Sequence, residues 1–253
     1  MTPIEKAQQF RSLHVAGNPL ILYNVWDAGS ALAVARAGAK AIATSSWSVA
    51  AAQGYLDGER LPLEVALAVV KLIVTNVDVP VTIDFEGGYA ADPETVGSNV
   101  SRLLALGVAG LNIEDQIVGT SGLYSVADQM ARLKSVRKAA DDLGIPAFIN
   151  ARTDVFLKAT PDVHHADLID EALARQVAYA EAGADGFFVP GLTDTTLIAR
   201  ICKAAILPVN VMMTVDLEQV KAVAALGVSR ISFGPLPYLA MTSALSGEAA
   251  AFG

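Results

Sequence analysis

The chain has 253 residues, of which 53% are hydrophobic and 17% charged, and this composition excludes a disordered protein. A net charge of -8 and a pI near 4.8 argue against nucleic acid as a partner, because no cluster of Lys and Arg offsets the acidity. The single cysteine, Cys202, excludes an intrachain disulfide and indicates a reducing, cytoplasmic setting. The N-terminus is polar, so no signal peptide is expected. Charged residues interrupt the apolar stretch at residues 28–52, so no membrane-spanning segment is expected.

Along the chain, the sequence repeats one pattern, the end of a helix followed by a short apolar strand. An apolar strand is expected at residues 20–24. In four later places a helix ends at a glycine and continues into a short apolar strand, at residues 35–44, 104–114, 180–190 and 224–234. In three weaker copies proline breaks the helix and opens the strand, at residues 76–84, 142–151 and 204–212. The pattern therefore predicts eight strands separated by helices.

Helix start signals stand between these strands. They are Asp92 with Pro93, Ser125 with Asp128, and Thr214 with Val215. In the helix after Ser125 a mostly apolar stripe faces inward, and Arg137 extends from its edge. Eight apolar strands, each followed by a helix, predict an α/β protein with a (β/α)8 TIM barrel and a single domain over residues 1–253. The alternative is an open doubly wound sheet, but residues 23–31 lack its glycine-rich phosphate loop.

Polar side chains gather just past the predicted strand ends, where a barrel builds its site. In strand order they are Asn24, Trp26 and Asp27; Thr44, Ser45 and Ser46; Asp84 and Glu86; Glu114 and Asp115; Asn150, Arg152, Thr153 and Asp154; Pro190; and Asn210. So many carboxylates in one mouth would repel one another unless a cation neutralised them. All the candidate ligands are oxygen atoms, which favours Mg²⁺ or Mn²⁺ over zinc.

Some of these acids have a structural alternative as helix caps. Asp27, Asp92 and Asp154 stand where an N-cap could be, and for Asp27 and Asp154 capping is the favoured interpretation. For Asp84 and Glu86, which two glycines follow, a metal site is favoured.

Six motifs resemble the isocitrate lyase and phosphoenolpyruvate mutase superfamily in order and approximate spacing, from residue 18 to about residue 238. They are NVWDAGSA, ATSSWSVAAAQGYLDGE, TIDFEGGYA, LNIEDQ, INARTDVF and PVNVMM. The resemblance implies a (β/α)8 barrel, usually a tetramer with its last helix exchanged between neighbours. It also implies binding of Mg²⁺ and of a 2-oxo acid or its enolate.

The resemblance implies roles at the metal. Asp84 is similar to the carboxylate that binds Mg²⁺ directly. Asp57, Glu86 and Glu114 are similar to the carboxylates that hold metal-bound waters. Glu86 replaces the family's more usual aspartate, and its extra methylene favours a contact through water.

The resemblance also implies roles toward the substrate. Ser45, Ser46 and Trp47 fall where the family binds the substrate carboxylate, and Arg152 falls where an arginine contacts the substrate's oxygens. Asn210 is a further predicted substrate-binding residue. The predicted catalytic residues are Arg152, Asp57, Glu114 and Tyr124.

The loop at residues 115–129 lacks the residues that define two family chemistries. It has no cysteine or histidine of the kind found in the isocitrate and methylisocitrate lyases, and no lysine or asparagine of the kind found in the phosphonate enzymes. Cys202 lies in a predicted helix and is expected to be a packed core residue rather than a nucleophile. Candidates for a general acid or base are Tyr124, Ser121, Tyr89, His164 and His165, of which the two histidines read as surface residues.

The sequence thus predicts a Mg²⁺-dependent lyase that cleaves a C–C bond in a small 2-oxo or 2-hydroxy carboxylate through an enolate. One alternative is an enzyme acting on a phosphonate P–C bond. Another is a 2-oxo acid binding protein with little catalysis. The apolar C-terminal stretch at residues 234–253 would be exposed unless it docked, so a homodimer or homotetramer is expected.

Overall fold

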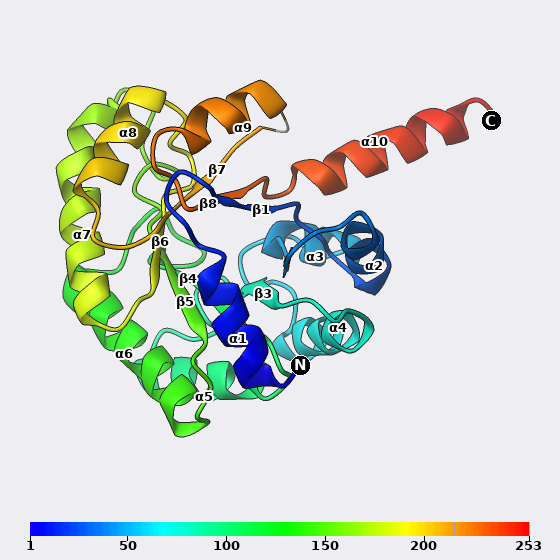
Figure 1. The fold of residues 1–253 in the computed structure, drawn as a ribbon, viewed down its shortest axis with the longest axis horizontal. Helices are drawn as coiled ribbons and strands as arrows, with labels where there is room; N and C mark the ends of the chain where they lie inside the picture. The colour runs from blue at the N-terminus through cyan, green and yellow to red at the C-terminus, as the bar shows by residue number, and fades with distance from the viewer. Residues whose placement is uncertain (215, 253) are drawn as a thin grey trace.

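Eight parallel strands form the centre of the computed structural model, which describes residues 1–214 and 216–252. The strands pair in the order β1-β8-β7-β6-β5-β4-β3-β2, and a parallel bridge between Val25 and Thr44 joins the two end strands. Figure 1 shows the helices arranged around this ring. The predicted (β/α)8 barrel is confirmed.

The strands are β1 (Leu20–Leu22), β2 (Ile42–Ala43), β3 (Val81–Asp84), β4 (Gly110–Glu114), β5 (Phe148–Arg152), β6 (Gly186–Phe188), β7 (Val209–Met212) and β8 (Arg230–Ser232). The helices are α1 (Pro3–Ser12), α2 (Ala28–Arg36), α3 (Ser46–Ala52), α4 (Leu63–Asn76), α5 (Pro93–Leu104), α6 (Val126–Asp142), α7 (Ile169–Glu181), α8 (Thr195–Ala204), α9 (Leu217–Ala224) and α10 (Leu236–Ala250), with a short 3₁₀ helix at His165–Leu168.

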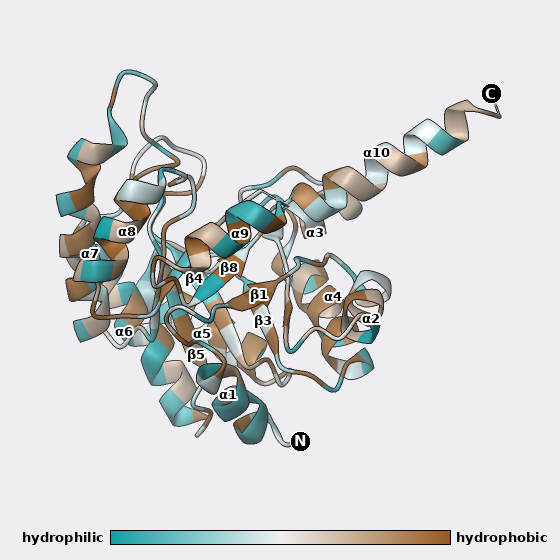
Figure 2. Cartoon of the chain, turned by 45° about the horizontal axis from the view of Figure 1, so that its top comes forward, coloured by the Kyte–Doolittle hydropathy of each residue, from teal (hydrophilic) through white to brown (hydrophobic). Residues whose placement is uncertain are grey.

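The outer helices bury one apolar stripe each against the sheet. In α5, Val96, Val100 and Leu103 recur at helical spacing and are fully buried. Gly97 on the same helix faces α6, where an added Cβ would overlap the Ser135 hydroxyl, so the missing side chain permits close helix packing. Figure 2 shows hydrophobic colours on β1 and β3 and hydrophilic colours on the exposed sides of α1 and α9.

Three of the predicted caps are confirmed. Asp27 accepts a hydrogen bond from the Ser30 amide (2.7 Å), Asp92 from that of Thr95 (2.9 Å) and Ser125 from that of Asp128 (3.1 Å). These bonds satisfy amide groups that the first helical turn leaves without partners.

Two predicted caps are wrong. Helix α9 begins at Leu217 with Asp216 as its cap, while the Thr214 hydroxyl donates to Gln219; Val215, the other half of that predicted start, lies outside the described residues. Asp154 caps no helix, because β5 is followed by a turn rather than a helix. Its carboxylate instead pairs with Arg152.

The two ends of the chain lie differently on the barrel. Helix α1 covers the N-terminal ends of the strands, where Phe10 packs edge-on against Phe148 with ring centres 5.7 Å apart. Helix α10 projects away from the barrel (Figure 1), and Pro237 is its one buried residue. Arg137 extends from the edge of α6, as predicted, to Asp185.

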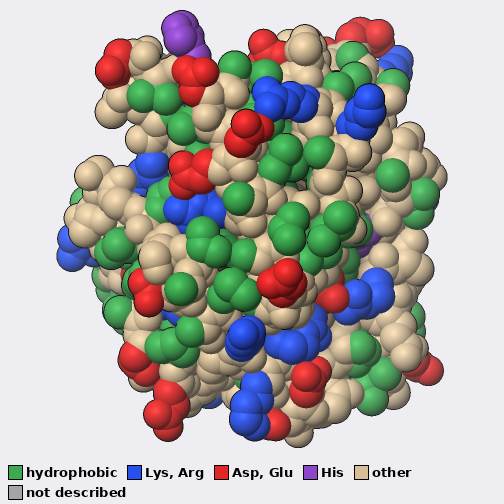
Figure 3. Space-filling view, turned by 90° about the vertical axis from the view of Figure 1, so that its left-hand side faces the viewer, with side chains coloured by type: hydrophobic (Ala, Val, Ile, Leu, Met, Phe, Trp, Pro, Cys, Tyr) green, Lys and Arg blue, Asp and Glu red, His purple; other side chains and the backbone are tan. Residues whose placement is uncertain are grey.

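Membrane-spanning helices and the charge on one face of the barrel bear on the possible partners. No helix within residues 1–214 and 216–252 combines the length and apolar character needed to cross a bilayer. On the face over α6, α7 and α8 (Figure 3), Lys and Arg side chains lie among Asp and Glu side chains.

Candidate active site

A cavity of about 150 Å³ opens at the C-terminal ends of the strands. Its lining residues are Asn24, Thr44, Ser45, Ser46, Trp47, Asp57, Asp84, Asn112, Arg152, Leu157, Phe188, Pro190, Met212, Ser232, Gly234 and Pro235. Substrate sites of barrel enzymes are built at this face. Six of the predicted site residues therefore share one cavity: Ser45, Ser46, Trp47, Asp57, Asp84 and Arg152.

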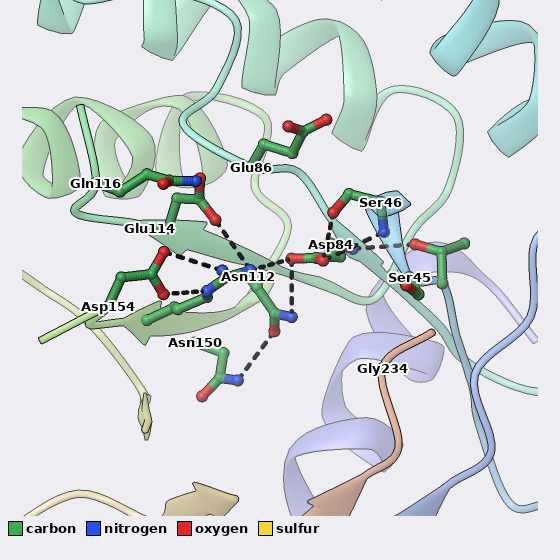
Figure 4. A network of polar contacts seen from close by, with 12 residues as sticks. Ser45, Ser46, Asp84, Glu86, Asn112, Glu114, Gln116, Asn150, Asp154 and Gly234 are labelled. Atoms are coloured by element: carbon green, nitrogen blue, oxygen red, sulfur yellow. Dashed lines mark hydrogen bonds and ion pairs between the residues drawn. The ribbon is translucent and has the colours of Figure 1, made fainter. Parts of the chain in front are cut away.

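Asp84 stands at the end of β3, held by neighbours on both sides (Figure 4). One carboxylate oxygen accepts hydrogen bonds from the Ser46 hydroxyl (2.8 Å) and amide (3.2 Å), and the other accepts one from the Asn112 amide group (3.3 Å). These donors fix the carboxylate at the cavity wall, at the start of α3. Ser45 caps that helix through a bond from the Ser48 amide (3.4 Å).

Arg152 ends β5 and is surrounded by carboxylates. Its Nη1 lies 2.9 Å from Glu114, its Nε lies 2.6 Å from Asp154, and its Nη1 lies 3.8 Å from Asp84. Burial alone would lower the pKa of Arg152, but Glu114, Asp154 and Asp84 outweigh it and raise the pKa well above its ordinary value. The guanidinium is therefore charged and held in one orientation by its fork of donors.

Two further acids near the cavity, Glu86 and Asp57, have raised pKa values. Burial, followed by the charges of Asp57 and Asp84, raises the pKa of Glu86 to about 8. Desolvation and the charge of Asp84 raise the pKa of Asp57. Burial is the larger cause of both shifts, and the remainder is repulsion between like charges, which a cation at Asp84 would relieve. The residues present therefore fit a divalent ion with oxygen ligands.

The geometry suits a metal held by one carboxylate and by waters rather than a closed cage. Among the described residues, no three His, Cys, Asp or Glu side chains already lie close enough to bind one ion. Glu86 lies apart from the Asp84 network in Figure 4, and its carboxylate accepts a bond from the Glu59 amide (2.6 Å). An ion at Asp84 would reach Glu86 and Glu114 through water, and the metal roles of these residues stay predictions.

The remaining predicted residues lie outside the cavity lining. The Tyr124 ring stacks on the Arg132 guanidinium, whose central carbon is 4.3 Å from the ring centre. Asn210 is buried below the mouth and accepts a bond from Asn150 (3.0 Å). The predicted catalytic role of Tyr124 and substrate-binding role of Asn210 remain predictions.

The other acid–base candidates are also dispersed. Tyr89 packs on Phe85, with ring centres 5.3 Å apart, and burial raises its pKa. Ser121 and His164 are exposed, and the His165 ring faces Phe156 at 5.4 Å. Cys202 lies half-buried in α8, and burial raises its pKa to about 11, which is unfavourable for a nucleophile.

Sequence reasoning missed the polar layer under the cavity. Asn112 on β4 donates to Asp84 and accepts bonds from Asn150 (2.9 Å) and from Arg230 on β8 (3.2 Å). Arg230 is 2% exposed, and burial lowers its pKa to about 9. The available signal was one charged residue inside an otherwise apolar strand, because such a residue must face the barrel interior and find a partner there.

The fold and this mouth define a (β/α)8-barrel protein with an arginine and carboxylates converging on a small cavity. The phosphoenolpyruvate phosphomutase family model matches residues 10–252, and the chain belongs to the isocitrate lyase and phosphoenolpyruvate mutase superfamily. The resemblance found in the six motifs is thereby confirmed.

Individual relatives cover most of the chain. An uncharacterised protein, Rv1998c of Mycobacterium tuberculosis, is 32% identical over 91% of this chain and 83% of its own length. The 2-methylisocitrate lyase of Escherichia coli is 28% identical over 81% of this chain and 69% of its own. The structure of a phosphonomutase-like protein from Burkholderia cenocepacia has a TM-score of 0.95 at 47% identity and covers 99% of this chain and 100% of that one.

Proposed function

We propose that the chain is a Mg²⁺-dependent lyase that cleaves a C–C bond in a small 2-oxo or 2-hydroxy carboxylate through an enolate. The observation that carries this proposal is the Arg152 guanidinium at the cavity wall, 3.8 Å from the Asp84 carboxylate and fixed by Glu114 and Asp154. Cleavage next to a carbonyl leaves negative charge on an oxygen, and a preorganised guanidinium stabilises that charge.

The chain's own residues divide the work. Ser45, Ser46 and Trp47 would bind the substrate carboxylate, and Arg152 would bind the oxygen on which charge develops. Asp84 would hold Mg²⁺ directly, and Asp57, Glu86 and Glu114 would hold its waters. Bound there, Mg²⁺ would supply Lewis-acid stabilisation of the developing oxyanion. Asp57, Glu114 and Tyr124 are the proposed groups for proton transfer.

Two other functions have support of their own. Chemistry at a P–C bond is favoured by the likeness to the Burkholderia phosphonomutase-like protein. A 2-oxo acid binding protein is favoured by residues 115–129, which contain no cysteine, histidine, lysine or asparagine. Retro-aldol cleavage or decarboxylation requires least from that loop. In both reactions Mg²⁺ and Arg152 could stabilise the developing negative charge without a further group from residues 115–129.

A substrate panel separates these functions. Purified protein would be incubated with oxaloacetate, 2-methylisocitrate, phosphonopyruvate and 4-hydroxy-2-oxo acids, with and without Mg²⁺. The proposal expects cleavage of a 2-oxo or 2-hydroxy acid that stops when Mg²⁺ is removed. Turnover of phosphonopyruvate alone would establish the P–C alternative, and Mg²⁺-dependent binding without turnover of any member would establish the binding protein.

The metal assignment has its own test in Asp84→Ala. We expect the variant to lose Mg²⁺ binding in calorimetry and to lose activity, because the proposed direct ligand is gone. The fold should persist, since removing one acid from a repelling group costs the core little. Asp78→Ala, at an exposed aspartate outside the cavity, is the matched control. Unchanged Mg²⁺ affinity in Asp84→Ala would refute the assignment.

We also propose that the protein is a homodimer or homotetramer that exchanges α10. The helix exposes Leu239, Met241 and Leu245 to solvent in one chain, which is an unusual run of apolar surface. The cytoplasmic setting expected from the single cysteine likewise stays a prediction.

A further inference from the structure

The cavity is divided into a polar and an apolar sector. Its charged residues and hydroxyls come mainly from the ends of β2, β3 and β5, whereas four apolar side chains come from the ends of β5, β6 and β7: Leu157, Phe188, Pro190 and Met212. We call these four residues the apolar wall. In a ring of eight strands, β6 and β7 stand opposite β2 and β3. A ligand held at Ser46 and Asp84 would therefore direct its far end toward the apolar wall.

The apolar wall offers no charge to that far end. Of the described residues that line the cavity, Arg152 alone is a cation, and the proposed function assigns it to the oxygen on which charge develops, at the other end of the ligand. The central carbon of the Arg152 guanidinium stands 6.0 Å from the Phe188 ring centre, which marks the border between the two sectors. A second carboxylate or a phosphonate against the wall would be desolvated without a partner, whereas an alkyl group would be stabilised by leaving water.

The size and shape of the wall point to a short group. The cavity volume is about 150 Å³, which is small for a ligand site. Gly191 has a φ of +85°, and a Cβ there would come within 2.9 Å of the Leu157 side chain. The glycine thus lets Leu157 lie close to the chain after β6, where it closes one side of the cavity.

We propose that the apolar wall is a specificity subsite for a short alkyl group, so that the substrate is a monocarboxylic 2-oxo acid rather than a dicarboxylate or a phosphonate. This inference rests on the proposed function of the same site. A 4-hydroxy-2-oxo acid with an alkyl end satisfies it. The hydroxyl proton passes to one of the groups proposed for proton transfer, the C3–C4 bond breaks, and the alkyl part departs as an aldehyde. The bond's electron pair forms the pyruvate enolate, which takes up a proton at C3. No oxidant or reductant is required.

Binding of matched acids tests the subsite without requiring turnover. Calorimetry in the presence of Mg²⁺ would compare 2-oxopentanoate with 2-oxoglutarate, which has the same number of carbons but ends in a carboxylate. The expected result is at least about tenfold tighter binding of 2-oxopentanoate, a factor that corresponds to about 1.4 kcal/mol. Equal affinity, tighter binding of 2-oxoglutarate, or binding of neither acid would overturn the proposal.

A charge placed on the apolar wall should reverse the preference. Leu157 is 44% exposed, so Leu157→Lys should fold. The variant should bind 2-oxoglutarate more tightly and 2-oxopentanoate more weakly than the wild type, whereas Leu143→Lys, at an equally exposed leucine after α6, should change neither affinity. An unchanged preference in Leu157→Lys would refute the subsite. Turnover of a dicarboxylate with no preference for an alkyl end would refute the subsite but support the lyase. Alkyl-selective binding without turnover of any acid would support the subsite but refute the lyase.

Discussion

At the scale of single residues, the proposed chemistry depends on how Arg152 is held. Three carboxylates lie within 4 Å of the guanidinium, and its side chain is 14% exposed. Asp154 accepts bonds from both Nε (2.6 Å) and Nη2 (2.9 Å). This forked pairing leaves Nη1 between Glu114 and Asp84, the latter a cavity-lining residue, and a lysine could not reproduce the arrangement.

We therefore predict that Arg152→Lys lowers kcat more than it raises KM. A contact that strengthens as the oxyanion forms is felt in kcat, whereas ordinary substrate binding is felt in KM. The expected loss is about two to three powers of ten in kcat, typical of removing one preorganised oxyanion donor. Steady-state kinetics on the substrate found by the panel would measure it, with Arg102→Lys as the control, since Arg102 pairs with Glu64 on the exposed side of α5. A variant with unchanged kcat and a higher KM would remove the enolate role from Arg152.

Residue positions at strand ends were the predictable part of the site. Barrel topology alone brings Ser46, Asp84 and Arg152 to one mouth, because parallel strands end at the same face. Asp154 was assigned wrongly as a cap because an aspartate after a strand can be either a helix N-cap or a site carboxylate. Only the turn that follows β5 in the structure excludes the cap. The apolar wall could not be recognised either, since Phe188 and Met212 read in sequence like any core residue.

At the scale of elements, α1 and the residues that follow it place an aromatic group at the base of the barrel, made of Phe10, the partly buried His14 and Phe148. The His14 ring stacks on Phe148 with centres 3.9 Å apart and meets the edge of Phe10 at 4.8 Å. Its Nδ1 lies 2.9 Å from the Phe10 carbonyl oxygen, which assigns the proton to that nitrogen. Burial lowers the pKa of His14 to about 3, with Arg230 and Arg11 adding to the shift. Arg11 is itself paired with Asp185 at 2.7 Å.

This shift predicts a loss of stability in acid. An unfolded histidine binds its proton near pH 6.5, while the folded ring stays neutral down to about pH 3. Between these values the unfolded state binds more protons, so the free energy of unfolding falls as the pH falls, by up to about 1.4 kcal/mol for each pH unit. The contribution of His14 is thus fully present above pH 6.5 and is lost below it. Urea denaturation at several pH values from 7 to 4.5 would measure the slope.

The variant His14→Phe isolates this effect. Phenylalanine keeps the stacked ring but cannot titrate, so the variant's stability should fall less steeply with acid than that of the wild type. Carboxylates titrate in both proteins and cancel in the comparison. His164→Phe, at an exposed histidine, should retain the wild-type slope. Parallel curves for the wild type and His14→Phe would show that the ring is protonated in the folded state.

Elements were predictable where local signals agreed. Proline after Asp92 and the serine before α6 fixed their helix starts, because cap chemistry acts over one turn. The start of α9 was predicted at Thr214, whereas the structure has its cap at Asp216, because both residue types can cap a helix and the sequence alone does not choose between them. The role of α1 as a cover for the barrel depends on contacts with distant residues such as Phe148, which no local pattern contains.

At the scale of the whole molecule, the part of the barrel that the structure describes has seven strands covered by a following helix and one, β8, that is not. Each of the first seven strands is followed by a helix that packs in the outer layer, but α10, which follows β8, projects away (Figure 1). Beside β1 the structure contains an apolar cavity of about 690 Å³, lined in part by Leu13, Ile21, Tyr23 and Val34. Ile21 and Tyr23 are each 40% exposed there. A parallel barrel normally covers this outer surface.

The displaced helix and the uncovered surface lead to the last prediction, that α10 of one copy packs against β1 of another. Both surfaces are apolar, and exchange of an identical element is a low-cost route to an oligomer. Light scattering at micromolar concentration should give a dimer or tetramer mass. Leu245→Glu on α10 and Ile21→Glu on β1 should each lower that mass, because each would place an unpaired charge in the contact. Leu143→Glu, at an exposed leucine after α6, should leave it unchanged. A wild-type monomer would refute the exchange, and so would an oligomer that both glutamate variants leave intact.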